Sequence, residues 1–463
     1  MLSPERTGLL KSFLGNLPES VAARLARAVE IDRLSDGKML PHEMILEGLR
    51  PVLRRAAGSD RTPTPLRLFC QPFEDLFSTM PRTTKQKGRI ARDSAGLVWT
   101  WLSLSVLPDD VRAYSREFKD FVVTGRHAQA RARAAAFWKL SGEAMRVALA
   151  DATRRKEARA QFGSDLVLAD AEEMANLLLI GDAVSELQTK LPKFTHALNE
   201  DMLWQLREIY ERVQATAPDS AAYVGVVAMN RLTRPWEALK LAGLISQQTQ
   251  DTKISSTDMG LIGEIIFSDI EANQVAVRAA RHPEFDAEAM VRHLSHFTTL
   301  STGIVKGIEI RRDGVWGQRL IKDRAALAEA MDDFMERAPA ELDAALPTTG
   351  NSPAVADFAH KVDPERIARA ERYVRLVAGC RPFAIAASFG AAQKKAEEQM
   401  MQLLRNYNED LIRELCEPES AQRALAEKQL DFLANLTAIL CSEEESGQLR
   451  RRARSALAAQ AAA

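Results

Sequence analysis

The sequence predicts an all-α protein, built as a multi-helical array of short and medium antiparallel helices with little or no sheet. Apolar residues recur at intervals of three and four along nearly all of the 463 residues, which places them on one face of successive helices. One such set is Leu177, Ile180, Val184 and Leu187. Prolines stand mainly where a helix can begin, and the connections are short, as they are between antiparallel neighbours.

Residues 1–80 are predicted to form a region of short helices. Pro4, Pro18 and Pro41 each stand at the start of an apolar pattern, where a proline can begin a helix without breaking one. Residues 81–95 then lack helical periodicity and carry many basic side chains. They are predicted to form a basic loop.

A central helical domain is predicted for residues 96–345, and its sequence is ambiguous at one point. Asp313 and Gly314 have the residue types of a type I′ turn, so residues 308–318 could form a β-hairpin. The same two residues could instead mark a break between two helices. We favour the helix break, because an isolated hairpin is marginally stable and no other strand is predicted nearby.

Residues 346–362 have the turn-forming composition of a linker between domains. Residues 363–442 follow as a C-terminal region with a helical hairpin. Its first long helix has an apolar stripe that consists of Ala392, Ala396, Met400, Leu403, Tyr407, Leu411 and Leu415. Residues 443–463 contain three glutamates, a run of arginines and an alanine-rich end, and are predicted to be a disordered tail.

Composition argues against several classes of protein. The 62 basic and 63 acidic side chains give a net charge of -1, so a nucleic acid is not expected as the main partner. The 4 cysteines lie far apart without a redox or zinc-binding spacing, which is typical of reduced thiols. No apolar run reaches the ~18–20 residues of a membrane span, and the first residues lack a signal-peptide core. We therefore expect a cytoplasmic protein without a membrane anchor, of a composition typical of bacteria.

One acidic run would suit an all-helical enzyme. Asp332, Asp333 and Glu336 resemble the aspartate-rich motif of all-helical isoprenoid synthases, in which carboxylates hold Mg²⁺ against a diphosphate. The second metal-binding motif of that family is missing from the sequence. We therefore interpret these residues as the solvated face of a helix, and we expect no metal and no cofactor.

Two further pairs of side chains have weaker catalytic potential. His293 and His296 are three residues apart on a predicted helix, but neither a Glu-x-x-His pair nor an HExxH motif accompanies them. We interpret one as packed and the other as solvent-facing. Asp357 and His360 lie in the predicted linker without a nucleophile motif. Glycine-rich phosphate-binding loops are absent.

The basic loop is the strongest candidate for a binding site. No acidic residue interrupts its positive charge between Asp75 and Asp93, and such a cluster can attract an acidic protein surface, lipid headgroups or nucleic-acid phosphate. An ordinary solvated loop is the alternative. We expect the loop to be accessible and predict that it binds a partner through Arg82, Lys85, Lys87, Arg89 and Arg92.

Taken as a whole, the sequence favours a non-enzymatic helical interaction, scaffold or adaptor protein with a protein partner, because long helical arrays expose faces that suit partner helices. One alternative is a Mg²⁺-dependent helical enzyme that uses Asp332, Asp333 and Glu336. The other is a regulator that contacts an anionic partner through residues 82–92. The identity of the partner and the oligomeric state do not follow from the sequence.

Overall fold

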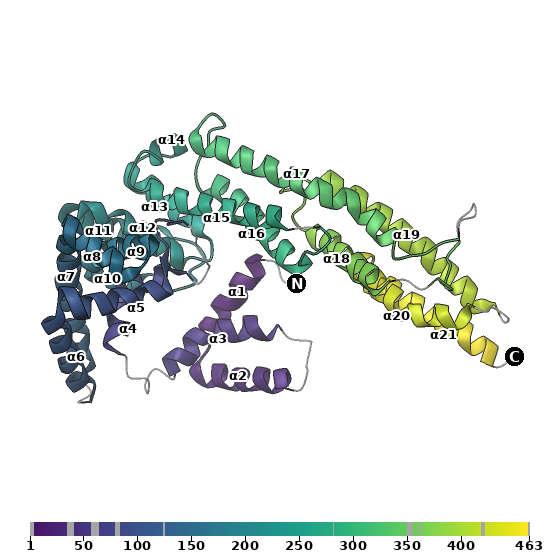
Figure 1. Ribbon diagram of the computed structural model, residues 1–463, viewed down its shortest axis with the longest axis horizontal. Coiled ribbons are helices and arrows are strands. Elements are labelled where there is room, and N and C mark those ends of the chain that lie inside the picture. The colour runs from purple at the N-terminus through teal and green to yellow at the C-terminus, as the bar shows by residue number, and fades with distance from the viewer. Residues whose placement is uncertain are drawn as a thin grey trace. The chain divides into compact units, whose positions relative to one another are not determined.

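The protein is built almost entirely of helices, as the computed structural model in Figure 1 shows. The structure describes residues 4–34, 41–56, 64–78, 84–123, 126–280, 282–349, 355–360, 363–417 and 422–461. Within these ranges the one sheet is a parallel pair of two-residue strands, β1 (Phe77–Ser78) and β2 (Ile90–Ala91). The predicted all-α fold is therefore confirmed.

The elements follow one another with short connections. The N-terminal helices are α1 (Pro4–Gly15), α2 (Glu19–Leu34) and α3 (His42–Ala56). The next elements are α4 (Pro65–Phe69), the 3₁₀-helix η2 (Gln71–Leu76), α5 (Arg92–Trp101), the π-helix η3 (Leu102–Val106), α6 (Pro108–Val123), α7 (His127–Ala150), α8 (Ala152–Phe162), α9 (Asp165–Leu179) and α10 (Gly181–Lys190).

The chain continues through α11 (Glu200–Thr216), the 3₁₀-helix η4 (Pro218–Ser220), α12 (Ala222–Arg231), the 3₁₀-helix η5 (Pro235–Glu237), α13 (Ala238–Ser246), α14 (Asp251–Ile254) and α15 (Gly260–Ala279). The remaining helices are α16 (Ala287–Gly307), α17 (Val315–Asp343), α18 (Pro364–Cys380), α19 (Gly390–Cys416), α20 (Arg423–Leu440) and α21 (Glu443–Ala461). None of the helices described is both long enough and apolar enough to cross a membrane.

The chain divides into two compact units that are not continuous in sequence. Unit 1 comprises Met1–Ser268 and Gly303–Trp316, and unit 2 comprises Asp269–Thr302 and Gly317–Ala463. The linker that we predict at residues 346–362 lies inside unit 2 and not between the two units.

Unit 1 begins with a small three-helix core. Leu14 on α1, Ala22 on α2 and Leu49 on α3 are buried against one another, as expected for a region of short helices. An ion pair of 2.6 Å between Lys11 Nζ and Glu47 Oε2 also joins α1 to α3. Removal of apolar surface from water is the main force that holds such small helical cores together.

An aromatic cluster forms the core around α4 to α7. Tyr114 and Phe137 stack with their ring centroids 4.3 Å apart, and Phe69 and Trp99 meet Phe137 from the side. The long helix α7 also packs along α9. Aromatic side chains bury large areas, so this cluster contributes strongly to the stability of unit 1.

Two tryptophans bring residues 303–316 into unit 1. Trp316 lies directly on Gly263, where a Cβ atom would come within 2.2 Å of the indole ring. Trp236 lies on Gly303 in the same way, again at 2.2 Å. The Trp316 indole also donates a hydrogen bond of 2.7 Å to Glu264 Oε1. Both glycines are thus required by the close approach of a large ring.

The break that we favour at Asp313 and Gly314 is confirmed. The chain makes a tight turn between α16 and α17, in which Gly314 N–H donates to the Arg311 carbonyl at 3.1 Å. Residues 308–318 form no hairpin. Glu309 instead makes an isolated parallel bridge with Gln250, and Arg311 N–H donates to the buried carboxylate of Asp251 at 3.2 Å.

The last four helices pack together in unit 2, where α20 contacts α18, α19 and α21. The predicted hairpin corresponds to α19 and α20. The described part of the predicted linker is attached to α19, because Ala356 N–H donates to Asp410 Oδ2 at 3.0 Å and Phe358 packs on the Tyr407 ring.

The prediction of a disordered tail after residue 442 is wrong for the residues that form α21. This helix buries Leu449 and Ala453, and its Arg452 forms a two-pronged ion pair with Glu409 of α19. A charge-rich sequence can thus form a helix when part of it docks on an apolar surface.

Candidate functional site

The four described residues of the predicted basic loop differ in their exposure. Arg82 lies outside the described residues. Lys85 and Arg89 turn into the protein and are only partly exposed, so the expectation of an accessible loop is wrong for these two residues. Lys87 and Arg92 are exposed and lie over the rings of Tyr223 and Phe77. Whether this loop binds a partner stays a prediction.

Lys85 is the centre of a buried polar cluster. Its ammonium group lies 2.7 Å from Asp170 Oδ1 and 2.5 Å from Glu173 Oε2, both on α9, and donates to the Arg89 carbonyl at 2.7 Å. Ser94 O–H donates to Asp170 Oδ2 at 2.7 Å. We call Lys85, Ser94, Asp170, Glu173 and Tyr223 the Lys85 cluster, since the Tyr223 hydroxyl completes it at 3.2 Å from Glu173 Oε1.

Electrostatics in the Lys85 cluster favour the charged carboxylate of Asp170. Burial alone would raise the pKa of this carboxyl, but hydrogen bonds from Lys85 and Ser94 outweigh burial and the pKa is lowered. Burial and the neighbouring Glu173 raise the pKa of Tyr223, which therefore remains a hydrogen-bond donor. Gly88 N–H donates to Glu173 Oε1 at 2.5 Å with φ of 82°, a conformation that glycine adopts without strain.

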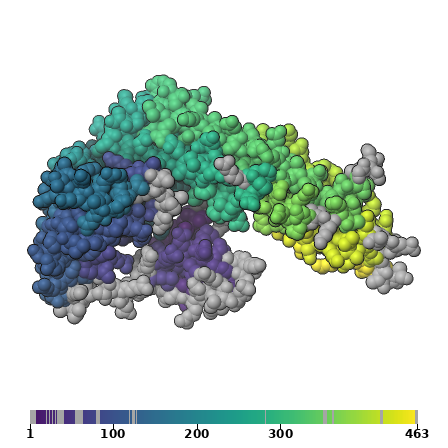
Figure 2. All heavy atoms as spheres, in the orientation of Figure 1, coloured from purple at the N-terminus to yellow at the C-terminus, as the bar shows by residue number. Residues whose placement is uncertain are grey.

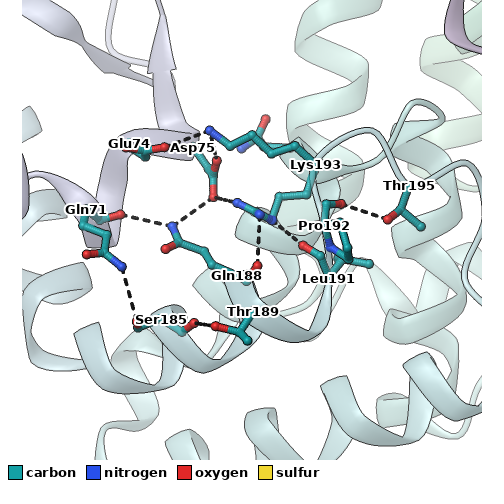
Figure 3. A network of polar contacts seen from close by, with 12 residues as sticks. Gln71, Glu74, Asp75, Ser185, Gln188, Thr189, Leu191, Pro192, Lys193 and Thr195 are labelled. Carbon is teal, nitrogen blue, oxygen red and sulfur yellow. Dashed lines mark hydrogen bonds and ion pairs between the residues drawn. The ribbon is translucent and has the colours of Figure 1, made fainter. Parts of the chain in front are cut away.

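A second cluster surrounds Asp75 of η2 (Figure 3). Arg231 Nη1 and Lys193 Nζ form ion pairs with its two oxygens at 2.7 and 2.9 Å, and Gln188 donates to it at 3.1 Å. Arg231 also donates to the carbonyls of Leu191 and Gln188. We call Asp75, Gln188, Lys193 and Arg231 the Asp75 cluster.

Both clusters are closed by internal partners. All three N–H donors of Lys85 have acceptors, and each carboxylate oxygen of Asp170 and Glu173 has a donor. A group that is satisfied in this way has little capacity left for a substrate or a metal ion. The clusters therefore hold the loop at residues 84–91 and the segment after α10 in place, which is a structural role.

Sequence reasoning missed the carboxylates of these clusters. Asp170 and Glu173 are three residues apart among the apolar residues of α9, and both are buried. Acidic residues are rarely buried unless they are paired, so their position on the apolar face was the available signal.

The acidic residues of α17 form no metal site. Asp332, Asp333 and Glu336 are exposed, and Asp333 is paired with Arg337 of the same helix at 2.9 Å. Across the described residues, no group of three or more His, Cys, Asp and Glu side chains is arranged to hold a metal ion.

The histidines of the two predicted pairs lie in different surroundings. His293 Nδ1 lies 2.9 Å from Asn273 Oδ1, and burial lowers its pKa, while His296 is exposed. Asp357 accepts a hydrogen bond from Ala359 N–H, and His360 lines a different, solvent-open depression with Asp343 and Asp363. All 4 cysteines belong to the described chain, and none forms a disulfide.

Large aromatic side chains remain on the surface at Phe13 of α1, which is 64% exposed, and at Trp204. Trp204, near the start of α11, is 58% exposed. The guanidinium of Arg207 lies 5.1 Å from its ring centre, and Glu211 accepts a hydrogen bond of 2.7 Å from the same guanidinium. The three residues are spaced along one helix face, so the Arg207 guanidinium packs on the face of the Trp204 indole in a cation–π contact.

The comparisons with known proteins do not assign the chain to a family. No protein-family model, no curated protein and no solved structure matches the chain.

Proposed function

We propose that this protein is a cytoplasmic helical interaction protein, a scaffold or adaptor, and that Trp204 is an anchor of its protein-binding surface. The exposure of Trp204 supports this proposal most directly. Among the other five tryptophans, Trp101, Trp138, Trp236 and Trp316 are each at most 9% exposed, and Trp99 is partly buried. Tryptophan and arginine are the side chains that most often dominate the energy of a protein interface.

The surroundings of Trp204 suit an anchor. Arg207 is fixed between the indole and Glu211, so both large side chains are ordered before a partner binds. Side chains that are ordered in advance lose less entropy on binding. The Lys85 and Asp75 clusters add to this support, because their polar groups are paired within the chain. A partner protein would then be bound by the helix surfaces.

The experiment is a capture assay with a matched surface control. The full chain, Trp204→Ala and Leu104→Ala are immobilised in equal amounts, and partners from source-cell lysate are quantified by mass spectrometry. Leu104 is 70% exposed on η3 and controls for the loss of any exposed apolar side chain. A true partner should bind the wild type and Leu104→Ala alike.

The same partner, once purified, should bind Trp204→Ala at least tenfold more weakly, since anchor residues contribute about 2 kcal/mol or more and 1.4 kcal/mol is tenfold. Equal affinity for wild type and Trp204→Ala would remove Trp204 from the interface. A capture in which no protein is enriched over a blank matrix would count against the interaction function itself.

A further inference from the structure

One face of α7 is uncovered and combines basic with apolar side chains. Lys139 and Arg146 are exposed and lie two helical turns apart. Leu140 and Val147 follow them at the same spacing and are 37% and 63% exposed. We call these four residues the α7 strip. Figure 2 shows this part of the chain, in dark blue, at the molecular surface.

The two cations of the α7 strip form no ion pair, although the exposed Glu143 lies between them on the same helix. Elsewhere on α7, Arg133 is paired with Glu117 of α6 at 2.5 Å. Lys139 and Arg146 form no ion pair with any described residue of the chain. The strip therefore offers two positive charges that are not engaged in ion pairs, beside two apolar side chains, with one negative charge from Glu143 between them.

A complementary face is present on α17. Glu329, Asp332 and Glu336 follow the spacing of one helix face and are all exposed, and they form no ion pair within the part of the chain that the structure describes. Ile321, 50% exposed, continues the same face toward the start of the helix. We call Glu329, Asp332 and Glu336 the α17 stripe.

The two faces match in charge and in spacing. Lys139 and Arg146 are seven residues apart, as are Glu329 and Glu336, which is about 10.5 Å along each helix. We infer that the α7 strip of one molecule binds the α17 stripe of a second copy of this chain. Opposite charges would fix the register of the two helices, and the neighbouring apolar side chains would be removed from water.

This contact joins two different surfaces, so association continues through further copies unless the contacts close into a ring. A molecule that has used its strip still has a free stripe, and association can continue through further copies. The inference is independent of Trp204, because neither surface includes α11. Failure of one proposal therefore leaves the other standing.

The first test is sedimentation velocity of the purified full chain over a wide concentration range at low and high salt. We expect self-association at low salt and weaker association at high salt, since salt screens exposed charges. A wild-type protein that stays monomeric at the highest concentration in low salt would overturn the inference.

The second test uses two blocked variants. Lys139→Glu with Arg146→Glu blocks the strip, and Glu329→Lys with Asp332→Lys and Glu336→Lys blocks the stripe. Each variant alone should be monomeric. An equimolar mixture should form a dimer and stop there, because the two molecules share one intact strip and one intact stripe. A mixture that stays monomeric, or that grows as the wild type does, would contradict the proposed pairing.

Two further variants separate this pairing from a general effect of charge. Arg154→Glu with Lys156→Glu changes the net charge as the strip variant does, at exposed positions of α8, and should associate like the wild type. Loss of association in this control would assign the effect to net charge and overturn the inference. Glu143, the exposed acid between the two cations, should oppose the contact, so Glu143→Lys should tighten association. Circular dichroism of every variant checks that the fold is retained.

Discussion

Two ion pairs, one in each unit, lie in opposite surroundings. In unit 1 the side chains of Asp75 and Arg231 are 1% and 8% exposed, and they form an ion pair of 2.7 Å in the interior. In unit 2, Arg452 and Glu409 join α21 to α19 through hydrogen bonds of 2.6 and 2.7 Å, yet their side chains are 49% and 58% exposed.

This difference in burial separates two roles for the same residue types. Loss of one partner from a buried pair leaves a charge that water cannot reach, and this is strongly destabilising. Loss of one partner from an exposed pair costs little, because water takes its place. The Asp75–Arg231 pair therefore contributes to stability in unit 1, whereas at the contact of α19 with α20 and α21 buried leucines such as Leu404 and Leu433 contribute more than the exposed Arg452–Glu409 pair.

The largest effect is expected from Lys85→Met. This change leaves Asp170 and Glu173 buried without a cation, so the free energy of unfolding of unit 1 should fall by about 3–5 kcal/mol. Urea unfolding followed by tryptophan fluorescence measures it, because all 6 tryptophans lie in unit 1. The exposed Lys87 is the matched control, and Lys87→Met should change stability by at most about 0.5 kcal/mol. Equal losses in the two variants would refute the role of the Lys85 cluster.

Leu433→Ala tests the leucine contacts of unit 2. Leu433 is completely buried in α20, so its truncation should cost about 2–5 kcal/mol. Leu403→Ala on α19 should cost less, because Leu403 is only partly buried and Leu404 takes the core position. Thermal unfolding followed by circular dichroism gives both values. A larger loss at Leu403 than at Leu433 would mean that another face of α19 meets the core.

Acid should distinguish the wild type from Lys85→Met. The pKa of Asp170 is lowered in the folded protein, so its contribution to stability is present above the pKa of the unfolded chain, about 4, and is lost as the pH falls through the lower folded value. Lys85→Met removes the hydrogen bond from Lys85 that lowers the pKa of Asp170 against the effect of burial. Protonation of Asp170 should then stabilise the fold of this variant. Urea midpoints measured by tryptophan fluorescence from neutral pH to pH ~3 should therefore fall less steeply in the variant. Parallel slopes would contradict this account.

The smallest effect is expected at the surface pairs of unit 2. A double-mutant cycle with Arg452→Ala and Glu409→Ala should give a coupling energy of about 1 kcal/mol or less, since both side chains are about half exposed. The coupling should shrink further at high salt. A coupling above about 2 kcal/mol would show that these exposed charges act like the buried pairs of unit 1.

Helical periodicity was sufficient to predict the fold class and the pairing of α19 with α20. It placed Leu403 in the core stripe, whereas the structure buries Leu404 more deeply. Leu403 and Leu404 are adjacent, and either one fits an apolar stripe with a period of 3.6 residues. The sequence therefore does not determine the rotation of α19 about its own axis to better than about 100°, the angle between successive residues.

The sites were less predictable, because their partners are remote in the sequence. Lys85 contacts carboxylates 85 and 88 residues away, and nothing in the local charge pattern of the basic loop indicates them. The tail was misjudged for the same reason. Arg452 meets Glu409, 43 residues earlier, so its docking depends on the fold of α19 and not on the composition of α21.

The return of the chain to unit 1 at residues 303–316 has a consequence for biosynthesis. When synthesis has reached residue 268, Trp236 and Gly263 are already part of the nascent chain. Gly303, which packs against Trp236, and Trp316, which packs against Gly263, have not yet been made. At about 5–20 residues per second, the 48 residues between 268 and 316 take about 2–10 s to make. During that interval the surfaces around Trp236 and Gly263 lack the residues that cover them in the finished unit, so apolar surface is exposed at this stage of translation.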